Sequence, residues 1–259
     1  MFAICITLIT IWCRLNSNIK NSNDQSLNTI DSILLRADSL YATHHESRFD
    51  SIYYLHDLNE VFLQKFHHEF AQYTFADNYI LYFFCMLTNH SHRGVVIPHH
   101  LALYDKGICS QQAILLIETA IQKGYRARPV RLNKHFVCEV FAYGQWHMLD
   151  PNLKLSFANP IFISSAQAYK NDILLRNNLY INHIKYSDKV LANTFFDTIE
   201  AGAENKFAAP NLKLLHEVSF FLSDYLWAFC WLLCAWLYKN NLTPLVQKRS
   251  TKNLHPSKV

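Results

Sequence analysis

The sequence contains little charge for its size. Charged residues make up 17% of the 259 residues, below the roughly one quarter that is usual in soluble domains. Hydrophobic residues account for 51% and aromatic residues for 14%. A chain of this length can form one domain with a sizeable core and smaller appendages. The shortage of charge indicates that some of the apolar residues lie outside an ordinary hydrophobic core.

An excess of basic charge is absent outside the carboxyl terminus. The net charge is +4, but residues 239–259 contain five basic and no acidic residues, so the rest of the chain carries −1. A folded part that is nearly neutral does not indicate a phosphate-binding surface. We therefore expect no nucleic-acid partner and no cofactor.

Regular cysteine motifs are absent as well. The sequence has no Cys-x-x-Cys pair, and its seven cysteines are irregularly spaced: Cys5, Cys13, Cys85, Cys109, Cys138, Cys230 and Cys234. Neither a disulfide scaffold nor a zinc ribbon is expected. If the domain is exported, at least one of Cys85, Cys109 and Cys138 is a free thiol, because three cysteines cannot all pair internally.

Histidines are frequent between residues 67 and 100, but they lack the partners of a metal site. No carboxylate or cysteine stands at a recognised spacing from them; they are His67, His68, His90, His92, His99 and His100. We expect these to be surface or loop histidines and predict no metal site. Residues 89–100, which contain Gly94 and Pro98, are predicted to form a loop.

The amino terminus begins with a short apolar run at residues 2–12. It is too short to span a bilayer comfortably and is typical of a signal-peptide core. No basic residue precedes it and no Ala-x-Ala site follows, so an uncleaved anchor, a misassigned start and a cleaved signal all stay open. We treat residues 1–15 as a signal-like or short anchor segment and the polar residues 16–29 as a linker.

A long apolar segment lies near the other end, at residues 218–238 (VSFFLSDYLWAFCWLLCAWLY). Its 21 residues are interrupted by only three polar side chains, Ser219, Ser223 and Asp224, and can cross a bilayer. We predict a transmembrane helix. A buried core helix is the alternative, because a carboxylate at the bilayer centre is unfavourable; Asp224, however, lies about two turns from the amino end, within reach of head groups.

The charges on either side of this segment predict its orientation. Residues 239–259 are basic, whereas residues 197–217 contain four acids and two lysines. Since Lys and Arg are retained on the cytoplasmic side, we expect a single-pass protein of the cell membrane with a cytoplasmic tail and the remaining domain outside.

Residues 30–100 are predicted to be a helical region. Apolar residues recur at helical spacing in two segments, first at Ile30, Ile33, Leu34, Ala37 and Leu40, then at Tyr54, Leu58, Phe62 and Phe66. A third apolar segment, residues 75–87, is dense in aromatic residues. These segments are expected to pack around or ahead of a core at residues 101–195.

A helix is predicted to begin at Cys109 or Ser110. Apolar residues recur on one face up to Ile121, and Gly124 supplies the stop. A cysteine at a helix start feels the positive end of the helix dipole and the unpaired amide hydrogens of the first turn, which favour the thiolate. Gly107 allows a close approach of backbone to a substrate. Cys109 is thus a candidate nucleophile, with a small buried hydrophobe as the alternative.

Three short strands follow this helix, at residues 127–132, 136–142 and 145–149, with a two-residue turn at Tyr143-Gly144. Counting outward from the turn places His135 diagonal to Asp150 on one sheet face, with His147 on the opposite face. A carboxylate beside an imidazole can orient it as the base for a thiol. Cys109, His135 and Asp150 are therefore the predicted catalytic residues.

Neighbouring side chains are weaker candidates for catalytic roles. Glu139 shares the face of His135 and could orient it in place of Asp150, or it could pair with Arg128. Cys138 and Trp146 are expected to be packing residues. A one-residue change of register would reverse the faces.

The motifs in residues 107–151 resemble the transglutaminase-like family of the papain-like cysteine enzymes. They are Gly-x-Cys before a helix, Gly-Tyr-Arg-Ala-Arg before a strand, His-x-x-x-Glu-Val at 135–140, and Trp-x-x-Leu-Asp-Pro at 146–151. The resemblance implies an α+β fold, with the cysteine helix packed on an antiparallel sheet that carries His and Asp. No acidic calcium-binding loop is visible.

The resemblance also implies an enzyme that acts on peptide or protein amides through an acyl-thioester, as a peptidase, an amidase or an acyl transferase. Two alternatives stay open: a catalytically silent domain that serves as an interaction module in the cell envelope, and an acyl transferase similar to the arylamine N-acetyltransferases.

Overall fold

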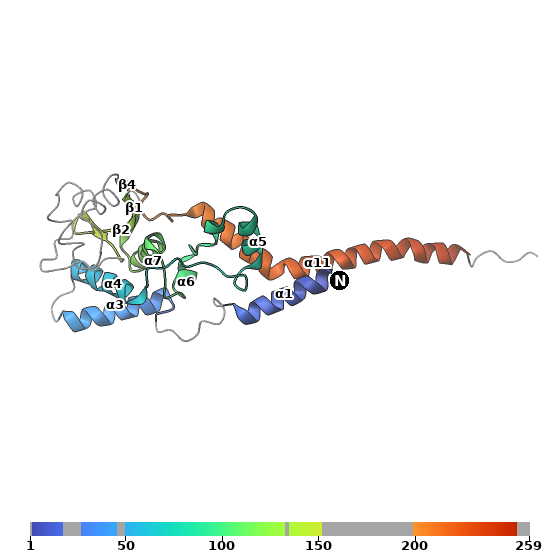
Figure 1. Cartoon of the computed structure of the whole chain (residues 1–259), viewed down its shortest axis with the longest axis horizontal. Coiled ribbons are helices and arrows are strands. Elements are labelled where there is room, and N and C mark those ends of the chain that lie inside the picture. The colour runs from blue at the N-terminus through green and yellow to red at the C-terminus, as the bar shows by residue number, and fades with distance from the viewer. Residues whose placement is uncertain (1, 18–26, 46–49, 133–134, 152–198, 253–259) are drawn as a thin grey trace, which may run out of the picture. The chain divides into compact units, whose positions relative to one another are not determined.

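The computed structural model (Figure 1) describes residues 2–17, 27–45, 50–132, 135–151 and 199–252, with the side chains of residues 241–252 left undescribed. The chain divides into two compact units. The helical unit comprises Met1–Asn21, Thr74–His90 and Leu215–Val259, and the sheet unit comprises Ser22–Tyr73 and Ser91–Leu214. Residues 30–100 thus contribute to both units. The part of the expected core between 152 and 195 lies outside the described residues.

The sheet unit is a mixed α+β structure, as the sequence predicts at this coarse level. Its described sheet has four antiparallel strands in the order β3-β2-β1-β4. These are β1 (Arg126–Leu132), β2 (His135–Ala142), β3 (Gln145–Leu149) and β4 (Ile199–Ala201). The helices of this unit are α3 (Ile30–His44), α4 (Ser51–Lys65), α6 (Pro98–Leu101) and α7 (Cys109–Gln122). Helix α7 packs against β1 and β2, and α3 packs against α4.

The predicted hairpin turn is confirmed. Tyr143 and Gly144 both have positive φ, 48° and 78°, as the tight turn between right-twisted strands requires. Ala142 pairs with Gln145, and the register continues to Cys138 opposite Leu149. The counting that assigns His135 and His147 to opposite faces therefore holds.

The helices begin and end where local capping chemistry allows. Thr29 accepts a hydrogen bond from the Ser32 N–H and so caps α3, while Asp50 accepts from the Ile52 N–H and caps α4. Helix α7 ends just before Gly124, which has a φ of 97°. The apolar faces of these helices form the core of the sheet unit, which includes Ile33, Leu55, Leu58, Leu101, Leu115 and Leu116.

The helical unit contains α1 (Phe2–Asn16), α5 (Tyr79–Leu87) and most of α11 (Pro210–Lys252). Asn78 caps α5 through the Leu81 N–H. Its side chain also donates to Ser219 Oγ and accepts from Ser223 Oγ, both at 2.8 Å. Two of the three polar residues of the predicted membrane segment thus bond to the start of α5, a common way for helices to associate in apolar surroundings.

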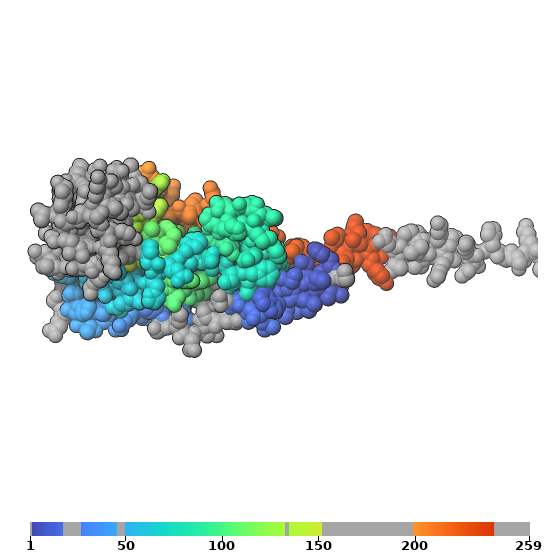
Figure 2. Space-filling model, viewed as in Figure 1, coloured from blue at the N-terminus to red at the C-terminus, as the bar shows by residue number. Residues whose placement is uncertain are grey.

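Helix α11 includes a segment that is long and apolar enough to cross a membrane. This segment, Pro210–Asn240, has 31 residues and contains the predicted span 218–238. Its apolar side chains are largely exposed, including Leu232, Leu233, Trp236 and Tyr238. In Figure 2 the red part of α11 continues past the blue α1, which lies against its start. Such exposure differs from that of a buried core helix, where most of the segment would be covered.

One local prediction needs correction. The segment predicted as a loop at 89–100 forms a 3₁₀ helix at His90–Arg93 and the start of α6 at Pro98. Proline at the first helical position needs no backbone N–H and favours such a start. In the expected linker 16–29, Asn16 is the last residue of α1, and Ser17 is buried and donates to Asp77 Oδ1 at 3.0 Å. Residues 18–26 lie outside the described residues.

Candidate active site

Cys109 is the first residue of α7. Ile108 precedes it in an extended conformation and offers no side-chain acceptor to the first turn. Within the described part of the chain, the N–H groups of Cys109 and Ser110 have no hydrogen-bond acceptor. The thiol therefore stands where the helix dipole is positive and where unpaired donors are available.

His135, the first residue of β2, is oriented by Asp150. Its Nε2 lies 2.5 Å from Asp150 Oδ2. The imidazole is 6% exposed and the carboxylate fully buried. His135 also hydrogen-bonds Cys109. Because Nε2 is bonded to the carboxylate, Nδ1 is the nitrogen that remains for the thiol.

These contacts shift the pKa of both members of the pair. Burial alone would raise the pKa of the Cys109 thiol, but the hydrogen bond and charge of His135 and a backbone hydrogen bond from Phe136 lower it below the ordinary value. Burial would lower the pKa of His135, but the charge and hydrogen bond of Asp150, with a smaller contribution from Cys109, raise it to about 10. Both shifts favour a thiolate beside an imidazolium.

Two glutamines position the segment that leads into Cys109. Gln111 is buried; its Nε2 donates to the carbonyls of Ala71 and Val95, and its Oε1 accepts from the N–H groups of Ala71 and Ile108. Gln112 Nε2 donates to the carbonyl of Gly107 at 2.5 Å. These bonds fix the approach of the chain to the helix start.

Gly107 is closely packed against side chains of the same unit. A Cβ added there would lie 3.3 Å from Gln112 Cγ and 3.5 Å from a ring carbon of Phe66. The neighbours at this position are side chains of the protein itself, and the predicted approach of the Gly107 backbone to a substrate stays a prediction.

The other candidates near the hairpin have different partners. Glu139 pairs with Arg128, whose Nη2 lies 2.6 Å from Glu139 Oε2, and the Arg128 guanidinium lies 4.0 Å from the ring centroid of Trp146. His147 Nε2 lies 3.0 Å from the carbonyl oxygen of Ala142 on the other sheet face. Cys138 is completely buried, and burial raises its pKa well above the ordinary value.

The roles of Gln111 and Phe136 are not predicted from the sequence. Gln111 reads as an ordinary polar residue of a first helical turn, and its partners Ala71 and Val95 are 40 and 16 residues away. The N–H of Phe136 bonds to the sulfur only because β2 begins beside the start of α7. A possible signal is the polarity of Gln111 and Gln112 at positions that α7 buries.

The described geometry brings together a thiol, an imidazole and a carboxylate, in contact in that order. In general such a set can form a thiolate nucleophile and return a proton to a leaving group. No protein-family model, curated protein or solved structure matches the chain. The case for any function therefore depends on the site and on the sequence motifs.

Proposed function

We propose that this chain is a membrane-tethered cysteine enzyme that cleaves or transfers acyl groups of peptide or protein amides. In this proposal Cys109 is the nucleophile, His135 the general base and acid, and Asp150 the residue that orients the imidazole. The observation that carries the proposal is the chain of contacts from the half-buried Cys109 through His135 to the buried Asp150.

In the first half-reaction Cys109 Sγ attacks the carbonyl carbon of the amide, and the carbonyl π electrons move to the oxygen. The tetrahedral intermediate then collapses, the C–N bond breaks, and His135 transfers its proton to the departing amine. An acyl-thioester on Cys109 remains, and His135 is neutral. The raised pKa of His135 supports this role, because it keeps the proton on the imidazole at neutral pH until the leaving nitrogen needs it.

In the second half-reaction water or an amine attacks the thioester. His135 takes a proton from that nucleophile, the C–S bond breaks, and the thiolate–imidazolium pair is restored. The product is a carboxylic acid when water attacks and a new amide when an amine attacks.

Backbone N–H groups at the start of α7 are suited to bind the negative charge of the tetrahedral oxygen. Those of Cys109 and Ser110 have no acceptor within the described residues. Donors that are already oriented stabilise a developing oxyanion without reorganisation. This supports a transglutaminase-like or papain-like arrangement, in which the amide of the nucleophile contributes to the oxyanion site.

For the membrane attachment we propose a single-pass α11 in the cell membrane, a cytoplasmic tail, and the sheet unit outside. The basic tail and the exposed apolar surface of α11 support this arrangement. A topology reporter fused after Val259 should behave as cytoplasmic. An exported reporter would contradict the orientation without affecting the proposed chemistry.

The nucleophile can be tested by alkylating the full chain in detergent micelles with iodoacetamide at a series of pH values. Peptide mass spectrometry then gives the rate for each cysteine. We expect the rate at Cys109 to reach half its maximum below pH 9, the ordinary thiol value. His135→Gln should move that midpoint upward, because the imidazolium that favours the thiolate is removed.

The matched control is Cys138→Ala, which removes the cysteine of β2. Cys138 is fully buried on β2, so its replacement should leave the labelling of Cys109 unchanged. A peptidyl vinyl sulfone, which resembles a peptide amide, should react with the wild-type chain and not with Cys109→Ala. If Cys109 labels only above pH 9 and the vinyl sulfone does not react, the catalytic proposal is wrong and a silent interaction module becomes the better hypothesis.

A further inference from the structure

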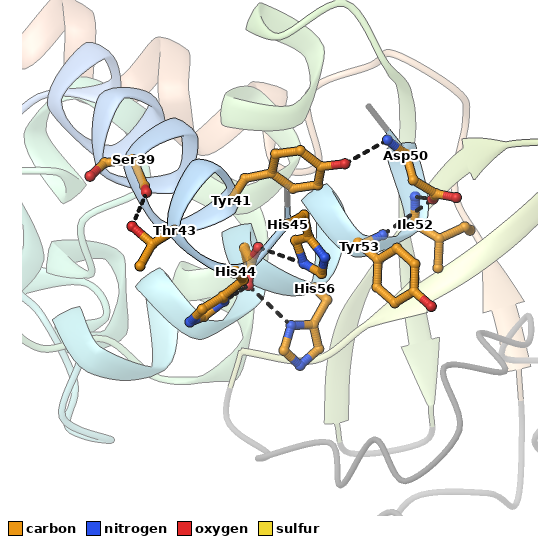
Figure 3. Close-up of polar contacts among 10 residues, drawn as sticks. Ser39, Tyr41, Thr43, His44, His45, Asp50, Ile52, Tyr53 and His56 are labelled. Carbon is orange, nitrogen blue, oxygen red and sulfur yellow. Dashed lines mark hydrogen bonds and ion pairs between the residues drawn. The ribbon is translucent and has the colours of Figure 1, made fainter. Parts of the chain in front are cut away.

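Three histidines surround one buried carboxylate at the contact between α3 and α4. His44 Nδ1 lies 2.9 Å and His56 Nδ1 3.4 Å from Asp57 Oδ1, and His45 Nε2 lies 3.5 Å from Asp57 Oδ2. Figure 3 shows the rings of His44, His45 and His56 turned toward one another, from the end of α3 and from α4. One atom from each of His44, His45 and Asp57 lies within 4.8 Å of the others.

Asp57 is completely buried, and its Oδ2 has no hydrogen-bond donor within the described part of the chain. Removing a carboxylate from water is costly unless a cation or hydrogen bonds compensate. His45 Nε2 lies 3.5 Å from Oδ2, which is an ion-pair contact and not a hydrogen bond. The geometry leaves one buried acceptor facing the space between the imidazoles.

The surroundings of His45 hold its ring in place. The ring lies between Tyr41 and Tyr53, with centroid separations of 4.7 Å to each. Tyr41 is itself fixed, because its hydroxyl accepts a hydrogen bond from the backbone N–H of Asp50, the residue that caps α4. Such support is typical of metal-binding sites, in which neighbouring residues orient the side chains that bind the ion.

The ligand chemistry is that of a divalent transition metal. Imidazole nitrogen and carboxylate oxygen bind Zn²⁺ at about 2.0–2.2 Å, and two ligand atoms of a tetrahedral site are then about 3.3–3.5 Å apart. The 3.5 Å separation between Asp57 Oδ2 and His45 Nε2 is of this size. His44 Nδ1 lies 2.9 Å from Asp57 Oδ1, a hydrogen-bond distance, and this hydrogen bond would be exchanged for the metal when the ion binds. Hydrogen bonds within the described residues do not compensate the burial of Asp57 Oδ2, which receives none.

We propose that His44, His45 and Asp57 form a zinc-binding site that joins the carboxyl end of α3 to α4. His56 is a positioning residue, which orients the carboxylate through Asp57 Oδ1. The fourth coordination position is taken by water or another oxygen donor. The site is independent of the proposed catalytic triad, since it shares no residue with it.

The test is a Zn²⁺ titration of the full chain in detergent micelles, with binding followed by competition with a chromogenic chelator. We expect one Zn²⁺ per chain and a rise in melting temperature, because a metal that binds the folded state stabilises it. X-ray absorption should show only nitrogen and oxygen ligands near 2.0 Å.

His44→Ala is the decisive variant, because His44 is 47% exposed in its side chain and its loss should leave the fold intact. We expect this variant to lose stoichiometric binding. His56→Ala should retain the site with affinity weakened by about 10- to 100-fold. The matched control is His67→Ala, an exposed histidine of the same unit outside the cluster, which should bind as the wild type does.

Two results would overturn the proposal. One is a folded wild-type chain that binds no Zn²⁺ in the competition assay. The other is a His44→Ala variant that binds Zn²⁺ as tightly as the wild type, which would locate the metal elsewhere. Asp57→Asn adds a second check: if it folds, it should lose the metal and its stability should no longer respond to Zn²⁺.

Discussion

Asp150 Oδ2 lies 2.5 Å from Nε2 of His135, and the pair is almost fully buried beside the Cys109 thiol. The carboxylate comes from the residue after β3, and the imidazole from the first residue of β2. Their contact depends on the tight turn at Tyr143-Gly144, because that turn sets the register of the two strands. The hairpin therefore determines how strongly His135 holds a proton.

The stability of the fold should depend on pH through His135. The pKa of His135 is raised from 6.5 to about 10 in the folded chain. A raised pKa adds stability that is fully present below pH 6.5 and is lost as pH rises through 10. We compare Cys109→Ala with the double variant Cys109→Ala/His135→Gln, so that the thiol does not titrate. Their difference in melting temperature should shrink steadily between about pH 6.5 and pH 10.

The control for this comparison is His67→Ala in the same Cys109→Ala background, since His67 is exposed. The difference in melting temperature that His67→Ala causes should not shrink in the same way between about pH 6.5 and pH 10. A difference between the first two variants that stays constant over the range would mean that Asp150 does not hold the proton on His135.

Asp150→Asn should lower the pKa of the His135 imidazole, which Asp150 raises in the wild-type chain. The charge and hydrogen bond of Asp150 are the main reasons for the raised pKa of His135, whereas burial acts to lower it. Removing the charge while keeping the size of the side chain should therefore lower the pKa of His135, measured by NMR titration of the labelled imidazole. Glu139→Gln is the matched control, because Glu139 lies on the same face but pairs with Arg128. Equal shifts in the two variants would contradict a specific role for Asp150.

The sequence predicts the parts of the site that depend on local pattern. The start of α7 at Cys109, its end before Gly124 and the register of the hairpin follow from short-range spacing and turn chemistry. His135 and Asp150 are only 15 residues apart, with a single turn between them. Their proximity was therefore accessible from counting residues along two strands.

Long-range contacts could not be predicted in this way. Gln111 bonds to residues 40 and 16 positions earlier in the chain. The cluster of His44, His45, His56 and Asp57 forms only because α3 and α4 pack against each other. Residues 74–90 belong to the helical unit, whereas the rest of the predicted helical region belongs to the sheet unit. This division likewise follows from tertiary packing.

Gln111 should contribute more to stability than an exposed glutamine of the same helix. Its side chain makes four hydrogen bonds to backbone groups of Ala71, Val95 and Ile108. Replacement by Ala leaves buried backbone groups unpaired, at a cost of about 1–3 kcal/mol for each group that water cannot reach. We expect Gln111→Ala to lower the free energy of unfolding by about 3 kcal/mol in urea titrations.

The matched control is Gln122→Ala, at the other end of α7. Gln122 Nε2 donates to Asp31 in an exposed position, so its loss should change stability by less than about 0.5 kcal/mol. Equal effects of the two variants would show that the Gln111 contacts do not hold the segments before Cys109.

The sequence leaves open whether the apolar amino terminus is cleaved or retained. Within the helical unit, α1 buries Ala3, Thr10 and Cys13. Thr10 Oγ1 lies 3.4 Å from the Tyr79 hydroxyl, and Arg14 Nη2 lies 3.6 Å from Asp224 Oδ1. The second contact places a guanidinium beside the one carboxylate of the predicted membrane segment, where an uncompensated charge is unfavourable.

A cleaved signal would remove both contacts, so we expect α1 to be retained in the mature protein. The measurement is the intact mass of the chain purified from membranes through a tag placed after Val259, which should include residues 2–17. Arg14→Ala should lower the yield of folded chain in detergent more than Arg36→Ala, which changes an arginine of the sheet unit. A mature chain that begins after residue 17 would show that α1 acts as a signal and that Asp224 is compensated by head groups or water instead.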